Sequence, residues 1–188
     1  MREAVSRVVS DLTAVVTGLG EPRRAEVRRL YSAADLTILN VIWGPRMTIM
    51  PHNHLMWAVI GIYSGREGNI FRRRLTDEPS GRVEAAGAKS LGERDAEPLG
   101  RDIIHSVTNP LSRLTGAIRV YGGDFFAVFR SDWDPETLLE RTMLIRLTPK
   151  STTGSLTAET RCRHACRRLA SCGSAISGFS PGVSTALS

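Results

Sequence analysis

The sequence predicts a single all-β domain, a sandwich or barrel, and two observations lead to this fold class. Short apolar segments of strand-like composition follow one another from Leu36 to Arg130, and turn-forming Gly, Pro, Asn and Ser residues separate them. No helical periodicity interrupts this series. A length of 188 residues with 41% hydrophobic residues is sufficient for one globular core.

Two helices are predicted ahead of the strands, so residues 1–34 are expected to pack as helices on the barrel. Apolar residues recur at three- and four-residue spacing over residues 5–19, which indicates an amphipathic helix ending near Gly18 or Gly20. Pro22 can open a second, shorter helix. One side of that helix would carry Val27, Leu30 and Tyr31.

The barrel is expected to occupy residues 35–141. Its predicted strands are LTILNVIW (36–43), LMWAVIGIY (55–63), NIFRRRL (69–75), GRVEAAGA (81–88), DIIHSV (102–107), RLTGAIRVYG (113–122) and FFAVFR (125–130). The following segment, SDWDPETLLER, predicts a closing helix with Asp134 as its N-cap and Pro135 in its first turn.

Residues 142–188 differ in composition from the rest and predict a disordered tail. They are rich in Ser, Thr and Gly and hold six basic residues but one acidic residue, whereas residues 1–141 hold 19 basic and 18 acidic residues. The net charge of +6 therefore lies largely in the tail, and nucleic-acid binding is not expected of the barrel. A frameshifted end of the reading frame is a second explanation for this abrupt change.

All three cysteines also lie in the tail, so no disulfide framework is expected in the barrel. The Cys162-x-His164-x-Cys166 motif lacks a standard zinc spacing and is interpreted as chance. The chain has no apolar run of about 20 residues and its N-terminus lacks the layout of a signal peptide. A soluble, cytoplasmic protein without membrane contact is the expectation.

Three of the chain's four histidines occupy strand positions beside apolar runs. Side chains at i and i+2 share one face of a strand, so His52 and His54 are expected side by side. A barrel can bring His105, from a later strand, against this pair. Three neutral imidazoles on a rigid wall suit a divalent metal ion of the first transition row, which predicts a metal site.

These residues resemble the two-part pattern of the cupin superfamily: His52-x-His54 and, about fifty residues later, His105-x-x-x-Asn109. The resemblance implies a double-stranded β-helix, or jelly-roll, barrel. Two features depart from the pattern. Pro98-x-Gly100 lies two residues further from the histidine than is usual, and no glutamate follows the first histidine pair.

A ligand set without this glutamate resembles that of one branch, the cysteine dioxygenase-like thiol dioxygenases, which use three histidines and no acid. Trp43-Gly44-Pro45, HNHLMWAVIGIYSG, IHSVTN and AIRVYGGD resemble segments of that branch, over about residues 28–130. The resemblance implies a non-haem Fe(II) enzyme that oxidises a small thiol, of the cysteine or 3-mercaptopropionate type, with O₂ to a sulfinic acid. It also allows a homodimer, since cupins often pair through sheet edges.

Further functional residues are expected near the metal. Tyr121 would donate a hydrogen bond to oxygen or substrate, and Arg119, on the same strand face, would bind a substrate carboxylate. Trp57 would form a wall of the pocket. In the Ser-x-His-x-Tyr relay of this branch only the tyrosine is retained, because Ala117 and Arg119 occupy the other two positions.

Two other functions remain open on the same three ligands. With Zn, Mn or Ni the site would serve hydrolysis or isomerisation, because three-histidine zinc sites activate water. Alternatively, the protein is a non-catalytic cupin that binds a metal ion or a small ligand.

Overall fold

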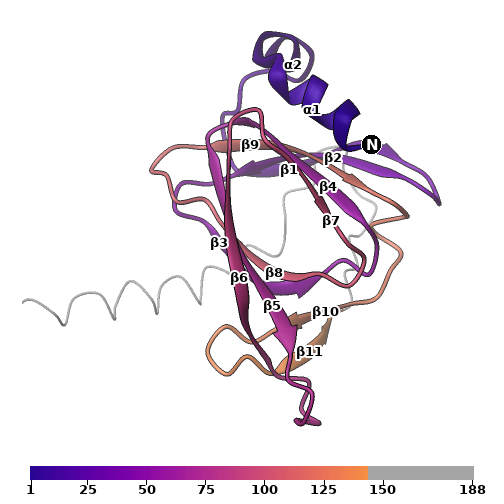
Figure 1. Cartoon of the computed structure of the whole chain (residues 1–188). Helices are drawn as coiled ribbons and strands as arrows, with labels where there is room; N and C mark the ends of the chain where they lie inside the picture. The colour runs from indigo at the N-terminus through magenta and orange to yellow at the C-terminus, as the bar shows by residue number, and fades with distance from the viewer. Residues whose placement is uncertain (144–188) are drawn as a thin grey trace, which may run out of the picture. The chain divides into compact units, whose positions relative to one another are not determined.

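A computed structural model describes residues 1–143 of the chain, and its architecture is all-β with two short helices at the N-terminus (Figure 1). The elements are α1 (Arg2–Ser10), α2 (Leu12–Leu19), β1 (Glu26–Ser32), β2 (Thr37–Trp43), β3 (Thr48–Asn53), β4 (Ala58–Ser64), β5 (Arg66–Arg74), β6 (Val83–Gly92), β7 (Ala96–Leu99), β8 (Ile104–Thr108), β9 (Thr115–Tyr121), β10 (Arg130–Trp133) and β11 (Glu140–Met143). The predicted tail lies almost wholly outside the described residues.

The strand pairing defines a double-stranded β-helix. Strands β2 to β5 and β6 to β9 are the two arms of one long antiparallel ribbon, in which β5 pairs with β6, β4 with β7, β3 with β8 and β2 with β9. The ribbon coils so that β4 also pairs with β9, and β5 with β8. Two sheets result, with strand orders β1-β2-β9-β4-β7 and β11-β10-β3-β8-β5-β6, which is the arrangement of a jelly roll. The predicted fold class is confirmed.

Side chains alternate between the inside and the outside of this barrel, as the two-residue period of a strand requires. The interior core is an apolar cluster that includes Leu39, Ile60 and Ala117. A second cluster on the outer face of the first sheet includes Ile118 and Val120, and it is covered by the helices. The interior cluster surrounds the histidines, so it determines the surroundings of the candidate site.

The helices cover the outer face of the first sheet, near β4, β7 and β9 (Figure 1). Val5 and Val9 of α1 are buried there, directly over Gly61 of β4, where a Cβ atom would collide with both valines. Glycine thus permits the close approach of α1 to the sheet. Neither of these two helices, the only ones among the described residues, is long and apolar enough to cross a membrane.

The N-terminal prediction of one helix over residues 5–19 followed by a second from Pro22 is wrong in its details. Asp11 has non-helical dihedral angles and divides the first helix, because its carboxylate accepts a hydrogen bond from Ala14 N at 2.9 Å and caps α2. The segment after Pro22 forms strand β1, paired with β2. Its apolar residues did not make a buried helical stripe, since Leu30 and Tyr31 are exposed.

The predicted closing helix is instead the turn of the β10–β11 hairpin. Asp134 does cap a turn, because its side chain accepts hydrogen bonds from the backbone N–H groups of Glu136 and Thr137. Leu138 then adopts a positive φ of 58°, which ends the helical turn, and the chain returns as β11 with Glu140 opposite Trp133.

The predicted strand over residues 125–130 is also wrong, except for Arg130, which begins β10. Asp124 folds this segment into a turn: its carboxylate accepts from Phe126 N at 2.9 Å and its carbonyl accepts from Ala127 N at 3.2 Å. Strand β7 was missed because it contains Pro98. Proline is tolerated there since β7 is an edge strand.

Candidate metal centre

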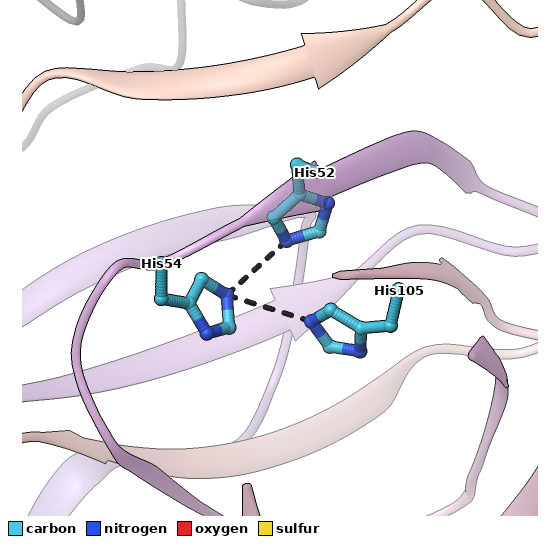
Figure 2. Close-up of side chains that lie close together, drawn as sticks. All are labelled: His52, His54 and His105. Atoms are coloured by element: carbon cyan, nitrogen blue, oxygen red, sulfur yellow. Dashed lines mark hydrogen bonds between the residues drawn. The ribbon is translucent and has the colours of Figure 1, made fainter. Parts of the chain in front are cut away.

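The three histidines predicted as ligands converge inside the barrel (Figure 2). His52 of β3 and His105 of β8 lie directly opposite each other in the antiparallel pairing of these strands. His54 follows immediately after β3, where Leu55 has a positive φ of 54° and turns the chain sharply. Local alternation therefore aligns two of the rings, and the pairing of strands that are distant in the sequence supplies the third.

The ring nitrogens that face one another are the Nε2 atoms. Nε2 of His54 lies 3.2 Å from Nε2 of His52 and 3.5 Å from Nε2 of His105. One ligand atom from each of the three residues falls within 4.8 Å of the others. Nitrogen ligands bind a transition metal at about 2.1 Å, so two of them at right or tetrahedral angles are about 3.0–3.4 Å apart. The two spacings from His54 therefore match those of nitrogen ligands on one divalent metal ion.

Hydrogen bonds on the far side of two rings fix their tautomers. Nδ1 of His52 lies 3.0 Å from the Met50 carbonyl, and Nδ1 of His105 lies 2.8 Å from Oδ1 of Asn69. A carbonyl oxygen accepts, so each Nδ1 carries the proton and donates it. Each Nε2 is therefore left with a lone pair directed at the centre of the group, which is the arrangement a metal ligand needs.

The three imidazoles are neutral at ordinary pH. Burial lowers the pKa of His52 from 6.5 to about 4. The hydrogen bond to the Met50 carbonyl opposes this shift, and the charges of Arg119 and Arg130 lower the pKa further. Burial also holds the pKa of His54 well below its usual value, and the charges of the neighbouring histidines and arginines act in the same direction. The pKa of His105 is likewise lowered, mainly by burial and further by the charges of His52 and Arg119. Ligation therefore requires no proton release near neutral pH.

A buried polar network behind His105 was missed by the sequence analysis. Nδ2 of Asn69 donates to Oε1 of Glu67 at 3.1 Å, so the amide presents its oxygen to His105. Oε2 of Glu67 accepts from Trp43 Nε1 at 2.8 Å and from Arg119 Nη2 at 2.6 Å. Glu67 and Asn69 could have been found by strand alternation, because they share the interior face of β5 with Phe71.

Tyr121 and Arg119 both lie on the interior face of β9, as their spacing predicts. The ring of Tyr121 is buried and stands edge-on to that of His54, with ring centroids 5.1 Å apart. Arg119 is 2% exposed and forms a buried ion pair with Glu67. Burial alone would lower the pKa of Arg119, but Glu67 and Tyr121 more than offset it. The guanidinium predicted to bind substrate already has a carboxylate partner.

Trp57 lies apart from these residues. Its side chain is 40% exposed and packs against Gly122, leaving no space there for a Cβ atom. The preceding residue, Met56, is buried in the interior cluster. Ala58 opens β4 with its side chain inside the barrel, so Trp57 faces the other way. The structure does not bring Trp57 together with the histidines.

No protein-family model matches the chain. Solved structures with a similar fold include an RmlC-like cupin family protein with a double-stranded β-helix from Methanocaldococcus jannaschii, at 10% identity, 56% coverage of this chain, 85% of that chain and a TM-score of 0.45. Another is BH2720 from Bacillus halodurans, at 14% identity, 62% and 77% coverage and a TM-score of 0.47.

Oxalate decarboxylase from Bacillus subtilis is a third similar structure, at 15% identity and a TM-score of 0.40, over 55% of this chain and 28% of that one. These likenesses concern the fold. The nested strand pairs independently define the same architecture. The strand pairing gives the chain a double-stranded β-helix fold, and the barrel carries within it a three-histidine group that could hold a divalent metal ion.

Proposed function

We propose that the chain is an iron-dependent dioxygenase that oxidises a small thiol to a sulfinic acid. One observation carries the proposal: within residues 1–143 the ligand group consists of three neutral imidazoles and includes no carboxylate. An uncompensated metal charge favours anionic ligands, and a thiolate is a soft anion that suits iron. Iron bound there would lower the pKa of a coordinated thiol and activate O₂ beside it.

The overall reaction is balanced without a further reductant, because RSH and O₂ give RSO₂H. The sulfur is oxidised, both oxygen atoms end on it, and the S–H proton ends on the sulfinic acid or in solvent. The barrel contributes an enclosed surrounding, since His54 and His105 are 2% and 0% exposed. Such a surrounding strengthens electrostatic contacts with the substrate and limits access of water.

Tyr121 would act as a hydrogen-bond donor toward the substrate or its developing oxygen atoms. Its buried ring contacts His54 edge-on, and its hydroxyl lies close enough to Arg119 to influence the pKa of that residue. A fixed donor beside a site of developing negative charge stabilises that charge without reorganisation. The ion pair between Arg119 and Glu67 holds the interior face of β9, and thus Tyr121, in position.

The test combines elemental analysis with oxygen consumption. Purified protein is expected to hold about one Fe per chain and to consume O₂ when cysteine or 3-mercaptopropionate is added. His105→Ala should lose both properties. Asn40→Ala is the matched control, because Asn40 is a buried polar residue that binds Tyr63 on the outer face of the sheet.

Each alternative function predicts a different result. Bound Zn, Mn or Ni with no thiol-dependent O₂ uptake by iron-loaded protein would point to hydrolysis or isomerisation. Stable metal binding without turnover of cysteine or 3-mercaptopropionate would favour a non-catalytic metal-binding cupin. Either result would reject the dioxygenase proposal.

A further inference from the structure

The candidate metal centre lies near the end of the barrel at which β9 finishes. Tyr121, the last residue of β9, is opposite both Thr37 at the start of β2 and Ala58 at the start of β4. His54 comes directly after β3, and Tyr121 stands edge-on to it. His54 and Tyr121 are each 2% exposed, so a ligand from solvent cannot reach them while this end of the barrel is covered.

Residues 124–129 (DFFAVF), here called the plug, cover this end. The plug connects β9 of the first sheet to β10 of the second, and its Phe125 and Phe126 pack against the interior apolar cluster. The centroid of the Phe125 ring lies 4.3 Å from that of Tyr121 and 6.3 Å from that of His54. Phe125 is itself only half-buried, so its ring is the layer between these two residues and solvent.

Two arginines from opposite sheets hold the rings of the plug. The guanidinium carbon of Arg29, on β1, lies 4.1 Å from the centroid of the Phe126 ring. That of Arg130, on β10, lies 3.7 Å from the centroid of the Phe125 ring, and its Nη2 donates to the Phe125 carbonyl at 2.6 Å. The two phenyl rings meet edge to face, with centroids 5.2 Å apart. Two cation–π contacts therefore stabilise the plug in its closed position.

The backbone of the plug belongs to no strand, so the ladders of the barrel do not hold it. The N–H of Phe125 donates to Thr37 Oγ1 at 3.1 Å, whereas the hydrogen bonds to Asp124 lie within the plug itself. Gly123, whose backbone is less restrained than that of other residues, precedes it. Segments with few hydrogen bonds to the rest of a fold open at a lower free energy than its central strands. The plug can therefore open while the barrel stays folded.

We infer that the plug is the gate of the three-histidine centre, and that Phe125 is the residue that blocks entry when the gate is closed. This inference rests on the proposed function for what enters, because a thiol and O₂ would have to reach the histidines. The closed gate excludes water, and the open gate admits the substrate. Opening breaks the contact between Phe126 and Arg29, which is exposed on β1, so this contact determines how often the gate opens.

The experiment measures access to His54 in the metal-free protein, so it depends on neither bound metal nor turnover. Diethyl pyrocarbonate acylates an accessible imidazole nitrogen, and mass spectrometry of the resulting peptides gives the rate at each histidine. In the wild type, His54 is expected to react at least about tenfold more slowly than in urea-unfolded protein, because only the open population reacts.

Variants of the plug should raise this rate. Arg29→Gln removes the cation–π contact with Phe126 and is expected to speed the modification of His54 about 2- to 30-fold, the range that one such contact provides. Phe125→Ala should speed it further because the blocking ring is gone, and Phe125→Leu should lie between Phe125→Ala and the wild type. Arg73→Gln is the matched control, since Arg73 is another exposed arginine, on β5, and its variant should react like the wild type.

Hydrogen exchange of the β9 amides separates opening of the gate from unfolding of the barrel. These amides should exchange equally slowly in the wild type and in Arg29→Gln. The inference is overturned if they exchange faster together with the modification of His54, because unfolding would then be the route of access.

Equal rates at His54 in the wild type, Arg29→Gln and Phe125→Ala would also overturn the inference, and would place the entrance beside the partly exposed His52. So would a wild-type rate equal to that of the unfolded chain, a comparison that needs no variant to fold. Oxygen uptake separates the gate from the proposed function. Faster modification in Arg29→Gln without thiol-dependent O₂ uptake by the wild type would keep the gate and reject the dioxygenase, whereas uptake with equal rates would do the reverse.

Discussion

Oδ1 of Asn69 lies 2.8 Å from Nδ1 of His105, and this contact connects the candidate metal centre to the charged interior of the barrel. Asn69 is itself held by Glu67, which binds both Trp43 and Arg119. The orientation of one ligand ring therefore depends on residues from three other strands. Outer hydrogen bonds of this kind fix the tautomer of a ligand and raise its basicity.

Replacing Asn69 is expected to weaken metal binding although every ligand remains. Asn69→Ala removes the acceptor for Nδ1–H of His105, so the ring can rotate or change tautomer. Affinity for Zn(II), measured by competition with a chromogenic chelator, should fall about 10- to 100-fold. Asn40→Ala, a buried asparagine outside the barrel interior, should leave the affinity unchanged. Equal affinities in both variants and the wild type would show that Asn69 does not support the site.

The ion pair between Glu67 and Arg119 should contribute strongly to stability only while both partners are present. Glu67→Gln leaves the Arg119 guanidinium buried without a counter-ion, and the free energy of unfolding should fall by about 3–5 kcal/mol. The double variant Glu67→Gln, Arg119→Met should lose clearly less than the sum of the two single variants in urea unfolding. Additive losses would indicate that the pair does not interact.

An exposed pair on the sheet surface provides the comparison. Arg73 and Glu84 are 2.7 Å apart, with side chains 72% and 43% exposed. The corresponding variants, Glu84→Gln and Arg73→Met, should change the free energy of unfolding by no more than about 1 kcal/mol, since solvent screens such pairs.

The stability of the metal-free protein should decrease as the pH falls from about 6.5 to 4. The folded-state pKa of His52 is lowered to about 4, so in this range the unfolded chain binds a proton that the folded chain does not. The full stability is present above pH 6.5, and His52 alone accounts for a loss of roughly 3 kcal/mol by pH 4. The shifts of His54 and His105 act in the same direction.

Urea unfolding with a chelator present, at several pH values, tests this dependence. Glu93, Asp134 and Glu140 have lowered pKa values through hydrogen bonds, so their contributions are lost at lower pH than those of the histidines. A His52→Gln variant should show a smaller slope between pH 6.5 and 4.5 than the wild type. Identical slopes would contradict the assignment to this histidine.

Gly61 should be sensitive to the addition of a single methyl group. The new Cβ atom of Gly61→Ala would collide with Val5 and Val9, so α1 has to move away from the sheet. We expect a loss of about 1–3 kcal/mol, measured by thermal unfolding, as for other overpacked cores. Gly68→Ala is the control, since its Cβ would meet only the Thr108 carbonyl at 3.7 Å. Equal unfolding temperatures would contradict the close packing of α1.

The sequence by itself determined the features that depend on neighbouring residues. Strand alternation placed Arg119 and Tyr121 on one face and aligned His52 with His54, and the succession of apolar segments and turns predicted the all-β class. Capping residues and local composition did not distinguish a helix from a hairpin where only a few residues are involved. Asp134 caps a turn in either case, and the pairing of β11 with β10 made this segment a hairpin instead of the predicted helix.

Only the tertiary structure decided which distant residues meet. The pairing of β3 with β8 placed His105 opposite His52, and the closure of the two sheets around one interior brought Glu67 of β5 to Arg119 of β9. The turn before β10 similarly left Arg130 buried and without a counter-ion near His54. The physical reason is that side-chain direction is set by the local backbone, whereas contact between strands far apart in the chain is set by their register, which depends on how the whole barrel closes.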